Sequence, residues 1–417
     1  MKNKIGIIGL GYVGLPLMVE MLKHYEVVGL DLDDERIKAL RSGNDYTNEV
    51  DDSILQELLS QGKLEISNKK DILEQVNFFI VTVPTPVDDS NVPNLKPLKS
   101  AITIIAEYLN KGDIVVIEST VFPGVTEEFC GPILENISGL TLNKDFFMGY
   151  SPERINPGDK EHHLSKIVKI VSGSNDESLM KISKLYSSII SAGVFETKNI
   201  KTAEAAKVIE NAQRDVNIAF INELTILFEK MNINIHDVLE AAETKWNFLP
   251  FKPGLVGGHC IGVDPYYLTY KASELGYHPE IIDAGRKIND SMPKFYAYDF
   301  IKKLSLKGKL NDETNLLILG ITFKENCPDI RNSKVIDLIK ELRDFGCNVD
   351  VYDPIANKDL VNEEYGIDLI NKQEDINWKI YSGIFGAVSH KEFKNLEIDF
   401  SSDPIIYEIK PNLNINF

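Results

Sequence analysis

Three glycines stand at a fixed spacing in Gly9-Leu10-Gly11-Tyr12-Val13-Gly14, directly after an apolar run at residues 4–10 and before a helical pattern at residues 15–23. A dinucleotide-binding G-x-G-x-x-G motif requires this strand, turn and helix context. The first glycine allows a tight turn, the second lets the backbone approach a pyrophosphate, and the third lets the helix pack on the strand. The stretch therefore predicts a βαβ unit whose helix N-terminus faces phosphate groups.

An acidic residue, Asp31, follows the second apolar run at residues 27–30. It stands at about the distance from the glycines at which an acid binds the ribose hydroxyls of a dinucleotide. A carboxylate at that place would repel the 2′-phosphate of NADP, so the sequence favours NAD as the cofactor. The alternative is a glycine turn with an incidental acid.

The rest of the chain repeats the α/β pattern. Further short apolar runs alternate with helical stretches at residues 78–83, 114–118, 146–149, 167–171, 315–323, 348–352, 380–388 and 405–409. A long helical segment interrupts them at residues 203–230. We predict an α/β protein with two Rossmann-like doubly wound domains joined by a central helical domain with a long helix. The expected domains are residues 1–200, 201–304 and 305–417.

Composition narrows the class of protein. The chain has 417 residues, 43% of them hydrophobic, and 45 basic against 63 acidic residues give a net charge of −18. This balance argues against nonspecific binding to nucleic acid or acidic membranes. No apolar stretch approaches the roughly 20 residues of a membrane span. The four cysteines are far apart without metal-ligand spacing and no signal peptide precedes the first strand, so we expect no metal and a cytoplasmic location.

Cys260 lies in the run Gly257-Gly258-His259-Cys260-Ile261-Gly262-Val263-Asp264. An aldehyde has no second hydride to lose until a nucleophile adds to it, and a thiolate adds readily. A thiol near a nicotinamide therefore indicates oxidation through a thiohemiacetal and a thioester, which makes a four-electron enzyme. Against this stands the common role of a free cysteine as a small buried hydrophobe.

Polar residues follow three predicted strands, at the edge where parallel sheets bind ligands. They are Pro84 with Thr85, Ser119 with Thr120, and Glu153. The threonines could equally cap helices, and most glutamates are solvated surface residues.

Two further groups carry charge. Lys207, Asn211 and Arg214 share one face of the long helix and could bind an oxyanion or an ordered water. Lys324 and Arg331 follow a strand of the last domain and suit phosphate groups. In both cases solvated surface charge is the alternative.

Taken together and in order along nearly the whole chain, these motifs resemble the UDP-glucose/GDP-mannose dehydrogenase family. The resemblance implies an NAD-binding first domain, a central helical domain that forms a homodimer, and a last domain that binds the nucleotide of the sugar donor. The implied reaction oxidises C6 of a nucleotide sugar to a carboxylate with two NAD⁺ and one water.

The resemblance also implies catalytic roles. Cys260 would be the nucleophile, and Lys207 with Asn211 would stabilise the oxyanion of the alcohol and thiohemiacetal stages. Thr120 and Asp264 would hold the water that accepts a proton, and Glu153 would support thioester hydrolysis.

Binding residues follow from the same resemblance. Expected cofactor contacts are Gly9, Gly11, Tyr12, Val13, Gly14, Asp31, Arg36, Pro84, Thr85, Ser119, Thr120 and Arg331. Expected substrate contacts are Glu153, Arg154, Ile155, Lys207, Asn211, Arg214, Phe248, Phe251, Gly254, Gly257 and Lys324.

Two departures bear on the sugar. Members that act on UDP-glucose place a lysine where this chain has Val263, and their glutamate-rich loop is here Arg154-Ile155-Asn156-Pro157. The chain looks like the branch that oxidises UDP-N-acetylhexosamines for bacterial surface polysaccharides. UDP-N-acetylglucosamine is the first choice; UDP-N-acetylgalactosamine, UDP-N-acetylmannosamine and UDP-glucose are alternatives. More remote alternatives are a two-electron hydroxyacid dehydrogenase, which leaves Cys260 and the last domain unexplained, and a noncatalytic nucleotide-sugar sensor.

Overall fold

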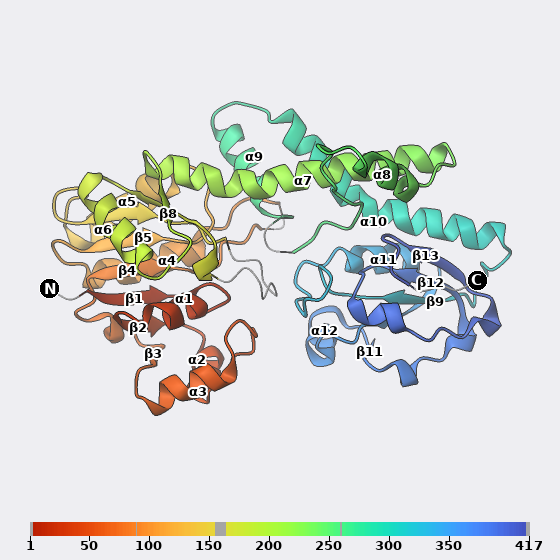
Figure 1. The fold of residues 1–417 in the computed structure, drawn as a ribbon, viewed down its shortest axis with the longest axis horizontal. Coiled ribbons are helices and arrows are strands. Elements are labelled where there is room, and N and C mark those ends of the chain that lie inside the picture. The colour runs from red at the N-terminus through yellow and green to blue at the C-terminus, as the bar shows by residue number, and fades with distance from the viewer. Residues whose placement is uncertain (1–2, 89, 155–163, 259–260, 414–417) are drawn as a thin grey trace. The chain divides into compact units, whose positions relative to one another are not determined.

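The computed structural model describes residues 3–88, 90–154, 164–258 and 261–413 (Figure 1). The chain divides into two compact units, here called the N-terminal unit (Met1–Glu210 with Tyr266–Gly276) and the C-terminal unit (Asn211–Pro265 with Tyr277–Phe417). The predicted central domain, residues 201–304, contributes to both units, and the three-domain division stays a prediction.

The N-terminal unit is built on an eight-stranded sheet in the order β3-β2-β1-β4-β5-β6-β7-β8 (Figure 1). Its strands are β1 (Lys4–Ile8), β2 (Glu26–Leu30), β3 (Glu65–Ser67), β4 (Phe78–Val81), β5 (Ile114–Ile117), β6 (Phe147–Tyr150), β7 (Lys169–Gly173) and β8 (Val194–Glu196). Among the described strands of this sheet, β6 and β7 pair antiparallel and the other neighbours pair parallel. Since the chain winds outward from β1 first through β2 and then through β4, right-handed crossovers put its helices on opposite faces.

Helices cover this sheet. They are α1 (Gly14–Met21), α2 (Asp34–Arg41), α3 (Asp52–Ser60), α4 (Lys96–Tyr108), α5 (Gly131–Ser138), α6 (Asp176–Ser187), the first part of α7 (Ile200–Lys230) and most of α9 (Asp264–Glu274). Every residue of β4 and β5 is buried, as expected for strands covered on both faces. Apolar side chains such as Ile5 of β1 and Leu17 of α1 form the core.

The C-terminal unit contains a five-stranded parallel sheet in the order β11-β10-β9-β12-β13. Its strands are β9 (Asn315–Leu319), β10 (Asn348–Tyr352), β11 (Leu369–Ile370), β12 (Tyr381–Gly386) and β13 (Ile405–Glu408). Its helices are the second part of α7, α8 (Ile235–Glu243), α10 (Glu280–Leu306), α11 (Val335–Asp344) and α12 (Lys358–Tyr365). Buried residues of α10 and α11, among them Phe300 and Leu338, form one core with the sheet.

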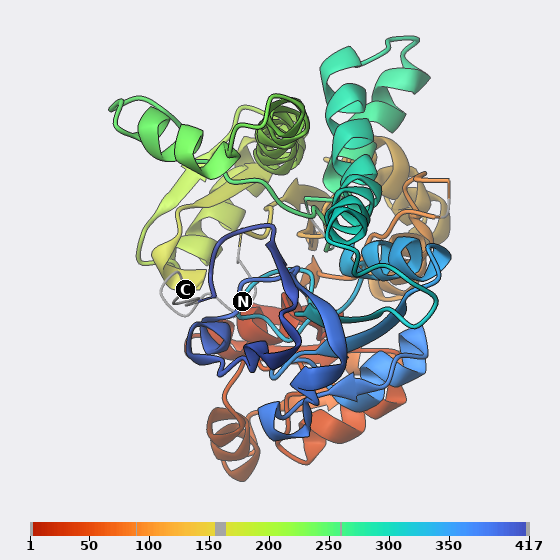
Figure 2. The ribbon, with the colours of Figure 1, turned by 90° about the vertical axis from the view of Figure 1, so that its right-hand side faces the viewer.

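Helix α7 is 31 residues long, and α8 packs on its second part through Ile221, Ile235 and Leu239. Figure 2 views α7 nearly end-on, with α8 beside it. The predicted fold class is confirmed by the two largely parallel sheets and this long helix. Within the described residues, no helix combines the length and the apolar character that crossing a membrane requires.

Candidate functional site

The glycine turn between β1 and α1 is closed on its inner side and open at one position. Gly9 has a φ of +96° and donates its N–H to the Leu30 carbonyl at 2.8 Å. A Cβ on Gly14 would stand 1.8 Å from the Gly9 carbonyl oxygen, so no side chain fits there. A Cβ on Gly11 would meet no atom within 4 Å. The open side of the turn thus fits the close approach of a pyrophosphate.

The N-terminus of α1 is also available for an anion. No side chain caps the first N–H groups of the helix, whose N-cap residue is Val13. The Leu15 N–H donates to the Gly11 carbonyl at 3.2 Å, and the positive end of the helix dipole still favours a phosphate. Tyr12, another predicted cofactor contact, lies in the same turn.

Asp31 follows β2, where an acid was expected. Its carboxylate accepts the Leu10 N–H at 2.7 Å and the Asp33 N–H at 3.0 Å, and the residue is half-buried. A carboxylate has about four lone-pair positions, so it retains acceptor capacity for the hydroxyl groups of a ribose.

Arg36, a predicted cofactor contact, lies beneath this turn. It is 2% exposed, and its guanidinium donates to the Leu10 carbonyl at 2.8 Å and to Asp45 at 2.7 Å. These contacts stabilise the position of the turn.

The ends of β4 and β5 are tied together by the predicted hydroxyl residues. Thr85 donates its hydroxyl to the Thr120 carbonyl at 2.7 Å, and Ser119 donates to the Val83 carbonyl at 2.7 Å. Tyr267 of α9 donates its hydroxyl to the Thr85 carbonyl. Pro84, which has no N–H, lies between two residues of this network. The network fixes the two loops that follow neighbouring strands.

Glu153 follows β6 and is buried in a charged cluster. Its Oε2 lies 3.5 Å from Lys169 Nζ, which lies 2.6 Å from Glu118 Oε2. Tyr186 of α6 donates its hydroxyl to the other oxygen of Glu118. The sequence prediction included Glu153 but assigned no role to Glu118, Lys169 or Tyr186. A lysine inside an apolar strand was the signal that could have found this cluster.

The residue after Glu153 extends the cluster toward α7. Arg154 donates from Nη2 to Glu210 at 2.6 Å. Its backbone N–H donates to Glu153 Oε1 at 2.5 Å. Ile155, another predicted substrate contact, lies outside the described residues.

The long helix presents Lys207 and Asn211 one turn apart. Lys207 is buried, at 8% exposure, in the N-terminal unit. In the C-terminal unit, Asn211 donates from Nδ2 to Asp264 Oδ2 at 2.6 Å, and Asp264 is buried at the start of α9. Arg214 is exposed.

Cys260 lies outside the described residues, but the segment before it is held firmly within the C-terminal unit. Gly258 donates its N–H to the Asn332 carbonyl at 3.0 Å and accepts from the Asn332 side chain at 2.9 Å. A Cβ on Gly257 would stand 2.3 Å from the same Asn332 carbonyl oxygen. Val263, beyond the cysteine, is buried.

The loop before this segment serves the core of the C-terminal unit. Phe248 and Phe251 pack against the apolar cluster of α7 and α8. Gly254 exchanges two hydrogen bonds of 3.0 Å with the side chain of Asn222. These three predicted substrate contacts thus pack or hydrogen-bond within the C-terminal unit, and their role in substrate binding stays a prediction.

After β9, Lys324 and Arg331 lie on one loop. Arg331 donates from Nε and Nη2 to the two oxygens of Asp329, at 2.9 and 2.7 Å. Lys324 Nζ lies 5.5 Å from the centre of the Phe323 ring. Both residues are half-buried.

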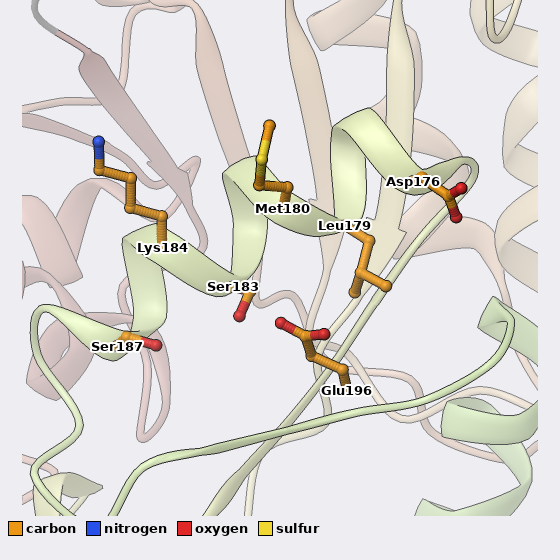
Figure 3. Close-up of a pocket in the computed structure, with 7 residues that line it drawn as sticks. All are labelled: Asp176, Leu179, Met180, Ser183, Lys184, Ser187 and Glu196. Atoms are coloured by element: carbon orange, nitrogen blue, oxygen red, sulfur yellow. The ribbon is translucent and has the colours of Figure 1, made fainter.

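A hollow of about 460 Å³ lies elsewhere, between α6 and β8. It is lined by Asp176, Leu179, Met180, Ser183, Lys184, Ser187 and Glu196. Figure 3 shows Leu179 and Ser183 of α6 directed toward Glu196 of β8. None of the predicted site residues lines it.

Comparison with known families matches all three parts of the chain. Residues 3–190 match the NAD binding domain of the UDP-glucose/GDP-mannose dehydrogenase family, residues 201–291 its central domain, and residues 317–414 its UDP binding domain.

Individual relatives match over nearly the whole length. A UDP-N-acetyl-D-glucosamine 6-dehydrogenase from Pseudomonas aeruginosa is 51% identical over 98% of this chain and 96% of its own. One from Salmonella typhi is 50% identical over 98% and 96%. Among solved structures, a UDP-D-ManNAc dehydrogenase from Pyrococcus horikoshii matches with a TM-score of 0.86 and 32% identity, covering 99% of this chain and 97% of its own.

Proposed function

The chain belongs to the UDP-glucose/GDP-mannose dehydrogenase family, and from this premise we propose that it oxidises C6 of UDP-N-acetyl-D-glucosamine to a carboxylate. It is an NAD-dependent oxidoreductase of the UDP-N-acetylhexosamine type. The observation that carries the choice of sugar is the 51% identity to a UDP-N-acetyl-D-glucosamine 6-dehydrogenase over 98% of the chain.

The glycine turn supports the cofactor. Gly11 leaves room for a pyrophosphate, the N-terminus of α1 has no side-chain cap among the described residues, and Asp31 keeps acceptor capacity for a ribose. When bound, NAD⁺ accepts the hydride of each of the two oxidations.

Cys260 is the proposed nucleophile. After the C6 alcohol has become an aldehyde, the thiolate adds to the carbonyl carbon and forms a thiohemiacetal. Loss of the second hydride leaves a thioester. Water then adds to the thioester carbon, and the C–S bond breaks to release the acid and the thiol.

Neighbouring residues assist these steps. Lys207, a buried cation, would stabilise the oxygen anion of the alcohol and thiohemiacetal stages, because charges act strongly where water is excluded. Asn211 assists it and is oriented by its hydrogen bond to Asp264. Thr120 and Asp264 would hold the proton-accepting water, and Glu153 would serve hydrolysis.

UDP-N-acetylmannosamine is the second candidate. A relative named UDP-N-acetyl-D-mannosamine dehydrogenase from Pyrococcus horikoshii is 36% identical over 84% of this chain. The lower identity places this sugar behind UDP-N-acetylglucosamine.

The helix α7 supports a homodimer. In the C-terminal unit, Phe220 and Leu227 lie seven residues apart on it, on the same face of the helix, and are 56% and 48% exposed. A second copy of the chain would cover them. Cys130 and Cys347 are buried thiols outside any disulfide, which fits the proposed reducing cytoplasm, where the enzyme would supply acidic sugars for polysaccharide synthesis.

A panel of UDP-sugars tests the proposal. The purified chain with NAD⁺ should form NADH with the highest kcat/KM on UDP-N-acetylglucosamine, followed by the galactosamine, mannosamine and glucose compounds. Cys260→Ser should reduce steady NADH formation to background while leaving NAD⁺ binding intact. If another UDP-sugar gives the highest kcat/KM, that sugar replaces UDP-N-acetylglucosamine as the proposed substrate. Undiminished acid production by Cys260→Ser would contradict the thioester mechanism.

A further inference from the structure

Four buried polar side chains meet beside the carboxyl ends of β5 and β6: Glu118, Glu153, Lys169 and Tyr186. Lys169 Nζ lies 2.6 Å from Glu118 Oε2 and 3.5 Å from Glu153 Oε2. The Tyr186 hydroxyl occupies the other oxygen of Glu118. One ammonium group therefore faces two carboxylates. Its shorter contact is to Glu118, which has no role in the proposed function.

Stability alone does not account for such a cluster. Taking charges out of water is costly, and well-packed apolar side chains often replace a buried ion pair at no loss of stability. Two carboxylates on one buried cation are a still less favourable arrangement. Perturbed charged clusters of this kind concentrate at functional sites.

The cluster constrains Glu153 from two sides. Lys169 attracts Oε2, while the Arg154 N–H donates to Oε1 at 2.5 Å. Arg154 is itself held by Glu210 of α7. The direction of the Glu153 carboxylate is thus set by contacts from β7, from its own loop and, through Arg154, from α7.

We propose that Lys169 and Glu118 are positioning residues for Glu153 in thioester hydrolysis. Lys169 aims the Glu153 carboxylate, and Glu118 holds the Lys169 ammonium group in place through the shorter ion pair. This inference rests on the proposed function. In the step concerned, water attacks the thioester carbon, its proton passes to Glu153, and the C–S bond breaks to regenerate the thiolate.

The charged groups of the cluster support the separate roles of Lys169 and Glu118. Burial raises the pKa of Glu118, against the lowering effect of the Lys169 ammonium. Although burial opposes it, Glu118 and Glu153 raise the pKa of Lys169, which stays a cation. Burial and then the Glu118 charge raise the pKa of Tyr186 well above its usual value, so its phenol remains a hydrogen-bond donor. Arg154 contacts Glu153 through its backbone N–H, and its guanidinium pairs with Glu210.

The first test separates oxidation from hydrolysis. Both hydride transfers precede hydrolysis, so rapid mixing of Glu118→Gln with UDP-N-acetylglucosamine and NAD⁺ should still give a burst of about two NADH per active site. The later steady phase should be about tenfold slower than in the unchanged chain, a fraction of the 10²–10⁴ that a general base contributes. Lys169→Arg should restore most of the rate lost in Lys169→Met. Lys181→Gln, which removes a cation paired with Glu177 on the surface of α6, is the control and should change neither phase.

The pH profile of the steady phase is the second test. In Glu118→Gln the cation faces Glu153 alone, so the acid limb should move to lower pH by about one unit. In Lys169→Met both carboxylates lose the Lys169 cation, and the limb should move to higher pH. If the cluster has a purely structural role, the acid limb should not move, or it should move in the same direction in both variants.

The outcomes distinguish this inference from the function on which it rests. If the unchanged chain forms no NADH from any UDP-sugar, the proposed function fails. If it forms NADH but Glu118→Gln loses burst and steady phase equally, with no shift of the acid limb, the positioning role is wrong. Because Lys169→Met leaves buried charges unpaired and can fail to fold, Glu118→Gln, which keeps the shape of the side chain, decides.

Discussion

The first strands of the two largely parallel sheets, β1 and β9, end in the same kind of glycine turn, and the two turns are used differently. In the N-terminal unit Gly9 ends β1 with a φ of +96° and donates its N–H to Leu30 at 2.8 Å. In the C-terminal unit Gly320 ends β9 with a φ of +89° and donates to Tyr352 at 2.8 Å. Both turns therefore close on the neighbouring strand in the same way.

The likeness extends to an aspartate after the second strand. Asp31 accepts the N–H of Leu10 at 2.7 Å, and Asp353 accepts the N–H of Ile321 at 2.8 Å. In each sheet the acceptor thus stabilises the residue directly after the turn glycine.

The difference lies in what fills the turn. Asp31 is half-buried and faces a turn that Gly11 leaves open. Asp353 is fully buried, accepts the N–H of Ala356 at 2.9 Å and lies 3.1 Å from the ring of His390. One turn keeps room and acceptor capacity for a dinucleotide, while the other is occupied by the protein's own groups. Shared topology thus provides a location, and the side chains decide its use.

The largest expected effect comes from adding a side chain on the closed, inner side of the glycine turn. In Gly14→Ala the new Cβ would overlap the Gly9 carbonyl oxygen at 1.8 Å, so the turn must deform. We expect a loss of about 3 kcal/mol of unfolding free energy and no stabilisation by NAD⁺, measured by thermal unfolding with and without cofactor.

Two matched variants show which property each glycine supplies. Gly11→Ala meets no atom within 4 Å, so it should keep the melting temperature and lose only NAD⁺ affinity. Gly320→Ala, whose Cβ would lie 2.5 Å from Val388, should lower stability and keep NAD⁺ affinity. The comparison is contradicted if Gly14→Ala has the same unfolding free energy and the same NAD⁺ affinity as the unchanged chain.

Exchanging the two aspartates for asparagine should give opposite results. Asp31→Asn should weaken NAD⁺ binding about tenfold, because a charged acceptor of the ribose is lost, and should reduce discrimination against NADP⁺. Asp353→Asn should cost about 2 kcal/mol of unfolding free energy without changing cofactor affinity. Titration calorimetry and urea unfolding measure both; equal loss of affinity in the two variants would contradict the assignment.

The smallest expected effect concerns how the unfolding free energy changes with pH, in which Asp353 and Glu204 should differ. Although burial opposes it, His390 helps to hold the pKa of Asp353 below its usual 3.8. The unfolded chain takes up this proton near 3.8 while the folded chain does not, so the stability it contributes is present above that pH and is lost as pH falls below it.

Glu204 of α7, in the N-terminal unit, should change the unfolding free energy with pH in the opposite direction. Burial raises its pKa to about 7, although its carboxylate accepts the N–H groups of Gly124 and Thr126. The unfolded chain releases this proton near 4.5, so the unfolding free energy should fall between pH 4.5 and 7 and level off above. Urea unfolding from pH 3 to 8 tests both residues. Asp353→Asn should remove the loss of unfolding free energy at acid pH, and Glu204→Gln should remove its decline toward neutral pH. Unchanged slopes in both variants would refute these assignments.

Features encoded by neighbouring residues were predictable from the sequence. The glycine turn and Asp31 lie within a few tens of residues of each other, and β10 has the predicted bounds, Asn348–Tyr352. The strands β3, β8 and β11, of two or three residues, were missed because they are too short to show a period.

Contacts between distant residues were not predictable. Lys169 joins Glu118 from 51 positions away, and Tyr186 joins it from 68, so only the folded sheet brings them together. The burial of Arg36 against Asp45 cannot be seen from spacing either, and the expected cofactor contact of Arg36 stays a prediction. The roles of Cys260 and Ile155 stay predictions.

The stoichiometry of NADH tests the central claim most directly. With limiting UDP-N-acetylglucosamine and excess NAD⁺, the account predicts two NADH for each sugar consumed and one uronic acid product, identified by mass spectrometry. One NADH per sugar, with an aldehyde or ketone as the product, would contradict the four-electron mechanism.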